Sequence, residues 1–374
     1  MSTFDQQYEK RDIMIPIAKP QLDDAEIQAV SDVLRSGIIA EGQRVAEFEQ
    51  AFAEYTGTEH AVAVNSGTAA LHAALLAHGI GRGDEVITSS FSFIATANSV
   101  LFTGAKPVFA DIRADTFNLD PQLIEEMITP ATKAIMPVHL YGQPADMDAI
   151  NDIVEEHDLI LIEDACQAHG AAYNRKKVGS FGTGAFSFYP TKNMTTSEGG
   201  IITTNNRGVA DKARMIRSHG SKQRYLHEML GYNLRMTDIS AAIGLVQLKK
   251  LPEYTARRQH NAKLLTEGIR DIESIECPVI TERCNHVFHQ YTIRTRNRDE
   301  LADHLKNNGI GTGIYYPIPI HKQPYYREIG YNDNLLVTER ASREVLSLPV
   351  HPGVTDEDIA TISNTIRDWS DPRC

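Results

Sequence analysis

The stretch AVAVNSGTAALHAALLA at residues 61–77 joins a short apolar run to an alanine- and leucine-rich segment. The run Ala61–Val64 contains no polar residue, which is typical of a strand buried on both faces of a sheet. Ala69–Ala77 is rich in strong helix formers. A strand that passes into a helix through a short turn is the repeating unit of α/β proteins, so this stretch predicts an α/β fold.

The same pattern recurs along the chain to about residue 205. Short runs of apolar and β-branched residues alternate with helical stretches such as Leu123–Met127 and Met147–His157. The alternation predicts a sheet whose two faces are covered by helices. The seven candidate strands are Ala61–Val64, Val86–Thr88, Pro107–Ala110, Ala134–Val138, Leu159–Ile162, Gly184–Phe188 and Ile201–Thr203.

Helices are also predicted on both sides of this region. Before it, two amphipathic patterns end at Gly37 and Gly57, and glycine is the residue that most often follows a last helical turn. After it, a helical pattern leads from Thr237 to Pro252. Because proline disrupts a helix interior, a separate helix is predicted beyond Pro252.

The length of 374 residues is enough for two domains. The sequence predicts a polar tail over residues 1–14, a large α/β domain over 15–250 and a smaller C-terminal α+β domain over 251–374. The smaller domain has a candidate strand at Gln290–Arg294 and a last helix that begins at Thr355.

The charge balance is acidic, because 37 Lys and Arg residues stand against 49 Asp and Glu residues. Such a chain repels a phosphate backbone at long range, so no nucleic-acid partner is expected. No run approaches the roughly 18 apolar residues of a membrane span, and the first residues lack the apolar core of a secretory signal. We therefore expect a cytoplasmic protein without a membrane partner. The four cysteines show no C-x-x-C spacing, so they are interpreted as reduced thiols.

The segment Asn65-Ser66-Gly67-Thr68 lies where the first strand passes into its helix. Free N–H groups and the positive end of the helix dipole converge at a helix N-terminus, which favours a bound phosphate. Gly67 would let a ligand approach the backbone closely, and the hydroxyls of Ser66 and Thr68 could add donors. The same residues also form an ordinary helix cap, and that alternative stays open.

Acidic residues follow the candidate strand Leu159–Ile162, in the order Glu163-Asp164. Open α/β sheets bind ligands at the carboxyl ends of their strands. A carboxylate there could be a solvated strand end, a metal ligand or the partner of a cationic ring nitrogen. Metal is the weakest of the three interpretations, because no His or Cys cluster with ligand spacing is present, and no metal is expected.

Lys192 follows Pro190 in a loop between two strongly apolar strands. In the strand before it, Phe186 and Phe188 point to one face and Ser187 to the other. This is an unusual position for a lysine that only solvates a surface. An ordinary loop lysine is the alternative.

Together these sites resemble the DegT/DnrJ/EryC1/StrS family of sugar aminotransferases, which are fold-type-I pyridoxal-phosphate enzymes. The resemblance spans nearly the whole chain, and it implies a large domain with a seven-stranded, mostly parallel sheet. The matching segments are Ile15–Pro20, Gly42–Glu49, Asn65–Ala69, Gly83–Ile87, Glu163–Gly170, Phe186–Gly200, Gly231–Arg235 and Tyr316–His321.

The resemblance implies pyridoxal 5′-phosphate as cofactor and assigns roles around it. Lys192 would form the internal aldimine and then carry a proton, and Asp164 would pair with the pyridine nitrogen. Phe93 would stack on the ring, with Phe91 as the nearby competitor and core packing as the alternative. The other implied cofactor contacts are Ser66, Gly67, Thr68, Gln167 and Ser187.

The resemblance also implies partners. Asn233 matches an asparagine that the family supplies from the neighbouring subunit, which implies a homodimer with shared sites. The implied reaction moves an amino group from an amino acid, with glutamate as the expected donor, to a nucleotide-linked ketosugar. Tyr316 and His321 lie in the proline-rich stretch from Tyr315 to Tyr326, a stiff loop expected at the sugar nucleotide, unless it is only a structural linker.

Two other functions stay open. An amino-acid aminotransferase or another enzyme of the same fold would clamp a substrate carboxylate with arginine, and Arg235 is a candidate for that contact. A non-catalytic cofactor-binding protein is disfavoured by the presence of Lys192, Asp164 and Ser187. Neither a dinucleotide-binding G-x-G-x-x-G nor a nucleotide-triphosphate loop is present.

Overall fold

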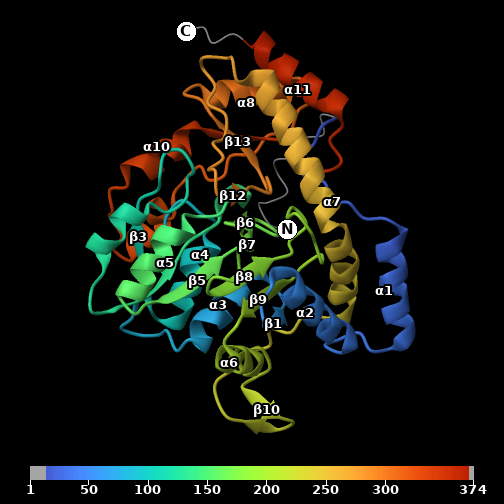
Figure 1. The fold of residues 1–374 in the computed structure, drawn as a ribbon, viewed down its shortest axis with the longest axis vertical. Helices are drawn as coiled ribbons and strands as arrows, with labels where there is room; N and C mark the ends of the chain where they lie inside the picture. Colours follow the sequence, from blue (N-terminus) through green and yellow to red (C-terminus); the bar gives the residue numbers. More distant parts are fainter. Residues whose placement is uncertain (1–13, 370–374) are drawn as a thin grey trace.

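A seven-stranded sheet forms the centre of the computed structural model, which describes residues 14–369 (Figure 1). The strand order is β1-β9-β8-β5-β4-β2-β3. β9 is antiparallel to both neighbours, and the other adjacent pairs are parallel. The predicted seven-stranded, mostly parallel sheet is therefore confirmed. Its strands are β1 (His60–Val64), β2 (Glu85–Ser89), β3 (Lys106–Ala110), β4 (Thr132–Met136), β5 (Ile160–Asp164), β8 (Thr183–Ser187) and β9 (Gly200–Thr204).

Helices surround this sheet and build the C-terminal part. The α-helices are α1 (Asp24–Ser36), α2 (Gln43–Thr56), α3 (Gly67–Ala77), α4 (Ala95–Thr103), α5 (Met147–Glu156), α6 (Arg207–Arg217), α7 (Asp238–Ile269), α8 (Arg298–Asn307), α9 (Pro324–Glu328), α10 (Leu336–Glu344) and α11 (Asp356–Asp368). Short 3-10 helices are η1 (Pro121–Leu123), η2 (Glu125–Met127), η3 (Leu140–Gly142) and η4 (Ile320–Lys322).

The remaining strands are short and form three small sheets. They are β6 (Ala172–Tyr173), β7 (Lys176–Lys177) and β12 (Cys284–Asn285) in one sheet, β10 (Ser221–Gln223) and β11 (Leu226–His227) in a hairpin, and β13 (Tyr291–Arg294) and β14 (Val345–Leu348) in a third.

Successive residues of β1 pack on opposite faces of the sheet. Val62 and Val64 belong to the core cluster that contains α3, whereas Ala61 and Ala63 belong to the cluster that contains α2. Side chains alternate along a strand, so a strand covered on both faces needs apolar residues at every position. This double burial explains the continuous apolar run in the sequence.

The parallel strands bring four loops to one edge of the sheet. The segments that follow β1, β2, β5 and β8 all begin at the carboxyl ends of strands that run in the same direction. Because β9 runs the opposite way, the segment that enters it also lies at this edge. Ligands of open α/β sheets bind at this edge.

The C-terminal part has its own core and is joined to the sheet by α7 (Figure 1). β13 and β14 pair antiparallel, and α8 and α11 pack beside them. The capping box predicted at Thr355 is present, with Asp358 as the second member. The predicted domain boundary near residue 250 falls within α7.

Two predictions of local structure are wrong. A single helix, α7, runs through Pro252, where two helices were predicted. Leu248 and Leu251 before the proline and Leu265 after it are buried, so packing along the helix outweighs the hydrogen bond that a proline removes. The stretch 123–127, predicted as helical, is part of two successive 3-10 turns.

None of the helices within residues 14–369 has the length and apolar character needed to cross a bilayer. The predicted polar tail lies almost wholly outside the described residues, as does Cys374.

Candidate active site

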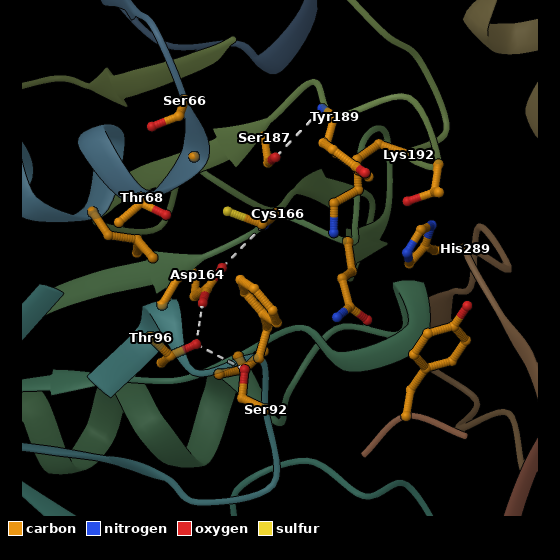
Figure 2. Close-up of a pocket in the computed structure, with 18 of the residues that line it drawn as sticks. Ser66, Thr68, Ser92, Thr96, Asp164, Cys166, Ser187, Tyr189, Lys192 and His289 are labelled. Carbon is orange, nitrogen blue, oxygen red and sulfur yellow. Dashed lines mark hydrogen bonds between the residues drawn. The ribbon is translucent and has the colours of Figure 1, made fainter. Parts of the chain in front are cut away.

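A cavity of about 510 Å³ opens at the carboxyl edge of the sheet (Figure 2). It brings together residues from segments far apart in the sequence. Of the residues proposed from the sequence, those that line it are Ser66, Gly67, Thr68, Phe93, Asp164, Gln167, Ser187, Lys192 and Tyr316.

The N-terminus of α3 forms one wall of the cavity. The Ser66 hydroxyl accepts a hydrogen bond from the amide of Ala69 at 3.1 Å, so Ser66 is a true helix cap. A Cβ atom on Gly67 would lie 2.5 Å from the Cβ of Ser187. Only glycine therefore fits between the helix and the end of β8. The first amides of a helix lack intrahelical acceptors, so this wall suits an anion.

Asp164 lies at the end of β5 with its carboxylate held from two sides. Oδ2 accepts a hydrogen bond from the Thr96 hydroxyl at 2.7 Å, and Oδ1 accepts one from the Cys166 amide at 3.2 Å (Figure 2). Thr96 in turn contacts the hydroxyl of Ser92 at 2.7 Å. Asp164 is 4% exposed, and these contacts fix the direction of its carboxylate toward the cavity.

Lys192 enters the cavity from the loop after β8. Its amide donates to the carbonyl of Tyr189 at 2.9 Å, which closes a turn around Pro190. Burial lowers the pKa of the Lys192 amine below the usual lysine value, and the nearby Cys166 and Asp164 act in the opposite direction. A larger fraction of this amine is therefore neutral, and so nucleophilic, than for a surface lysine.

The two candidate phenylalanines lie in different environments. Phe91 is completely buried and packs against Phe117 in the core. Phe93 is 55% exposed and lines the cavity, with its ring centroid 6.2 Å from that of Tyr316. Core packing therefore explains the position of Phe91, but it does not explain the position of Phe93.

Gln167 connects the end of β5 to the C-terminal part of the chain. Its Oε1 accepts a hydrogen bond from the Tyr141 amide at 2.8 Å, and its Nε2 donates to the Tyr316 hydroxyl at 3.0 Å. Burial and the nearby Asp164 raise the pKa of Tyr316, so its hydroxyl stays protonated at neutral pH. Tyr316 is thus a fixed polar group at the cavity wall.

Three residues proposed from the sequence do not line the cavity. His321 is completely buried, with Nδ1 2.6 Å from the Ser90 hydroxyl and Nε2 3.4 Å from Glu339. It therefore holds the loop against the end of β2. The Nε atom of Arg235 lies 3.9 Å from the Oε2 atom of Glu41 in the same chain. Asn233 is exposed, and its carbonyl accepts from the Asn65 side chain at 3.4 Å.

Further lining residues were not proposed from the sequence, among them Ser92, Thr96, Glu198, His289 and Gln290. Thr96 lies in the same short motif as Phe93, so a search for hydroxyl donors there could have found it. His289 comes from the loop before β13, and no sequence motif indicates that it would line the same cavity as Lys192. Among the described residues that line the cavity, Lys192 is the one lysine, and none is an arginine.

A lysine with a lowered pKa, a fixed carboxylate and a helix N-terminus meet around one cavity of this α/β sheet, and this arrangement suits an enzyme of the aminotransferase class. Comparison with known proteins places it within that class. Residues 20–367 match the DegT/DnrJ/EryC1/StrS aminotransferase family, and the chain belongs to this family. The resemblance noted in the sequence is therefore confirmed.

Individual relatives match over nearly their whole lengths. A pleiotropic regulatory protein of Geobacillus stearothermophilus is 46% identical, over 91% of each chain. GDP-perosamine synthase of Caulobacter vibrioides is 44% identical, over 92% of this chain and 95% of its own. The crystal structure of S. venezuelae DesV, in complex with a ketimine intermediate, superimposes with a TM-score of 0.91 at 40% identity, covering 95% of this chain and 98% of DesV.

Proposed function

We propose that this protein is a pyridoxal-phosphate-dependent aminotransferase that moves an amino group from glutamate to a nucleotide-linked ketosugar. The observation that carries the proposal is the meeting of Lys192, Asp164 and the N-terminus of α3 in one cavity. Family membership supports the reaction type, and the relative named GDP-perosamine synthase supports the sugar-nucleotide substrate.

The residues present fit pyridoxal phosphate. Its phosphate needs donors, which the first amides of α3 and the hydroxyls of Thr68 and Ser187 offer. The space beside them is kept open because a side chain at position 67 would collide with Ser187. When bound, the cofactor supplies a cationic ring that accepts electrons from the carbon being deprotonated.

The chain's own groups then have distinct tasks. Asp164, held by Thr96 and the Cys166 amide, would keep the ring nitrogen protonated. Phe93 would cover a face of the ring. Lys192 would attach to the cofactor aldehyde and, once released, move a proton at its Nζ atom.

The anionic substrates need more positive charge than the described part of this chain provides at the cavity, where Asp164 and Glu198 are acidic and the amine of Lys192 is the one basic side chain of a lysine or arginine. A second copy of the chain would supply the missing donors. The exposed Asn233 and the neighbouring Arg235 are the proposed contributions, which makes a homodimer with shared sites part of the proposal.

An amino-acid aminotransferase is the second candidate function. Such an enzyme usually clamps the substrate α-carboxylate with arginine. No arginine of the described residues of one chain lines this cavity, so Arg235 of a second copy would have to provide the clamp, and it would serve glutamate in either function. Tyr316 and the stiff loop that carries it instead offer neutral hydroxyl groups, which suit sugar hydroxyls.

The two half-reactions test the proposal separately. Adding glutamate to the cofactor-loaded protein should replace the visible absorbance of lysine-bound pyridoxal phosphate by that of the aminated cofactor. Adding keto sugar nucleotides one at a time should restore the first spectrum for at least one of them. Restoration by amino-acid-derived keto acids, and by no keto sugar nucleotide, would favour the second candidate.

A further inference from the structure

Gln167 and Tyr316 form a hydrogen-bonded pair in the wall of the cavity. Gln167 follows the end of β5, and Tyr316 belongs to the proline-rich stretch of the C-terminal part. Both residues line the cavity, and Nε2 of Gln167 lies 3.0 Å from the hydroxyl oxygen of Tyr316. The pair therefore joins two segments that are far apart in the sequence at one point of the cavity wall.

The backbone of Tyr141 determines the direction of this hydrogen bond. The amide nitrogen of Tyr141 lies 2.8 Å from Oε1 of Gln167. A backbone N–H can only donate, so the side-chain oxygen of Gln167 faces Tyr141 and its NH₂ group faces Tyr316. The hydroxyl oxygen of Tyr316 is therefore the acceptor in its bond with Gln167. The proton of that hydroxyl points elsewhere.

Tyr316 presents this proton to the cavity. Within residues 14–369, the side chain of Gln167 is the one hydrogen-bond partner of the Tyr316 hydroxyl. Burial and the nearby Asp164 raise the pKa of Tyr316, so the proton is retained over the whole neutral range. The other titratable groups around this hydroxyl are Tyr315, Tyr141 and Cys166. The cavity wall thus contains an O–H donor that lacks an acceptor within this part of the chain.

Pyridoxal phosphate has one polar atom to which the proposed function gives no partner outside Gln167. Its phosphate faces the N-terminus of α3, its ring nitrogen faces Asp164 and its aldehyde carbon faces Lys192. The remaining atom is the oxygen on the ring. One ring carbon separates the atom that carries this oxygen from the nitrogen, on the side away from the phosphate arm. A donor that lies near Asp164, as the Tyr316 hydroxyl does, is on the half of the ring that carries this oxygen.

We propose that the hydroxyl of Tyr316 donates a hydrogen bond to the ring oxygen of bound pyridoxal phosphate, in a direction that Gln167 fixes. This inference rests on the proposed function. The hydroxyl oxygen keeps a second lone pair, which can accept from a sugar hydroxyl, so Tyr316 can serve cofactor and sugar together. A donor stabilises the ring oxygen most when that oxygen is a full anion. Tyr316 therefore lowers the pH at which the lysine-bound cofactor loses the proton that its nitrogen shares with the ring oxygen.

The test measures this pH directly and needs no substrate. The full-length chain is loaded with pyridoxal phosphate, and the visible absorbance of the lysine-bound cofactor is titrated from pH 5 to pH 10. Tyr316→Phe removes the donor and keeps the ring, so the midpoint of the titration should rise by about one pH unit. Tyr325→Phe, an exposed tyrosine of the same stretch that lies outside the cavity lining, should leave the midpoint unchanged.

A second substitution gives a shift of opposite sign. 3-Fluorotyrosine at position 316 keeps the hydroxyl and makes its O–H a stronger donor, so the midpoint should move down. A residue that only packs against the cofactor would not move the midpoint up in Tyr316→Phe and down with 3-fluorotyrosine. The fluorinated protein also provides a result if Tyr316→Phe does not hold the cofactor.

The outcomes separate the inference from the proposed function. A midpoint that stays in place or falls in Tyr316→Phe, or that rises with 3-fluorotyrosine, would overturn the role of Tyr316 alone. Failure of the unmodified chain to form the lysine-bound cofactor at any pH would overturn the proposed function and this inference together. Opposite shifts in a protein that aminates no keto sugar nucleotide would support the inference and overturn the proposed substrate.

Discussion

Glu163 and Asp164 are adjacent carboxylates with different surroundings. Alternation along β5 turns Asp164 toward the cavity and Glu163 away from it. Glu163 is completely buried and accepts hydrogen bonds from the amides of Gly179, Phe181 and Gly182, at 2.7 to 2.9 Å. The residue pattern could not separate a structural from a chemical carboxylate in this pair, because the partners of Glu163 come from a loop that follows it, and only the family resemblance pointed to Asp164.

The first prediction concerns Lys192. Lys192→Ala removes the only amine proposed to attach the cofactor and to move the proton, so turnover should fall by about 10⁴-fold or more. The visible absorbance of lysine-bound cofactor should vanish, although pyridoxal phosphate can still bind through its phosphate. Steady-state rates and the absorbance spectrum check this, with Lys249→Ala, an exposed lysine of α7, as the control. Substantial turnover by Lys192→Ala would remove Lys192 from its assigned role.

Glu163 joins β5 to the loop before β8, and the second prediction concerns this connection. Its carboxylate joins the end of β5 to the loop 179–182 and to His139, whose Nε2 lies 3.1 Å away. Glu163→Gln places an amide group against backbone donors, so the free energy of unfolding should fall by about 2–4 kcal/mol.

Urea unfolding at one fixed protein concentration measures this loss, because association would otherwise change the apparent stability. Glu282→Gln, at an exposed position, should change stability by less than about 0.5 kcal/mol. If the two variants unfolded at the same urea concentration, Glu163 would not join these elements energetically.

The sequence predicts best those strands whose burial follows from their own residues and not from the segments that pack against them. β1 is apolar from Ala61 to Val64, and β5 is apolar over Ile160–Ile162 before its two acidic residues, so both strands could be predicted from composition. α7 shows the limit, because the packing that carries it through Pro252 involves both parts of the chain. The same limit holds for the cavity. Lys192 and Asp164 lie in recognisable local motifs, whereas His289 lines the same cavity only because of the path of the loop before β13.

For the whole molecule, we predict that activity depends on two copies of the chain. Lys192→Ala and Asn233→Ala subunits, each inactive or weak alone, should form mixed dimers in which one site carries both lesions and the other carries neither. Mixing should therefore restore up to about a quarter of the unmodified activity when half of the dimers are mixed. Differently tagged subunits, purified as verified mixed dimers with one intact site of two, should show about half of the unmodified activity. Mixed dimers without recovered activity would contradict sites shared through Asn233.

The transfer of nitrogen from glutamate to a nucleotide-linked ketosugar tests most directly the central claim that this protein is a sugar-nucleotide aminotransferase. The cofactor-loaded protein is incubated with ¹⁵N-labelled glutamate and a set of nucleotide-linked ketosugars, and the products are analysed by mass spectrometry. The account predicts an amino sugar nucleotide that contains ¹⁵N, with an equal amount of 2-oxoglutarate, and no such product from Lys192→Ala. If glutamate loses its label to the cofactor but no keto sugar nucleotide in a broad set acquires it, the assignment of a sugar-nucleotide aminotransferase is contradicted.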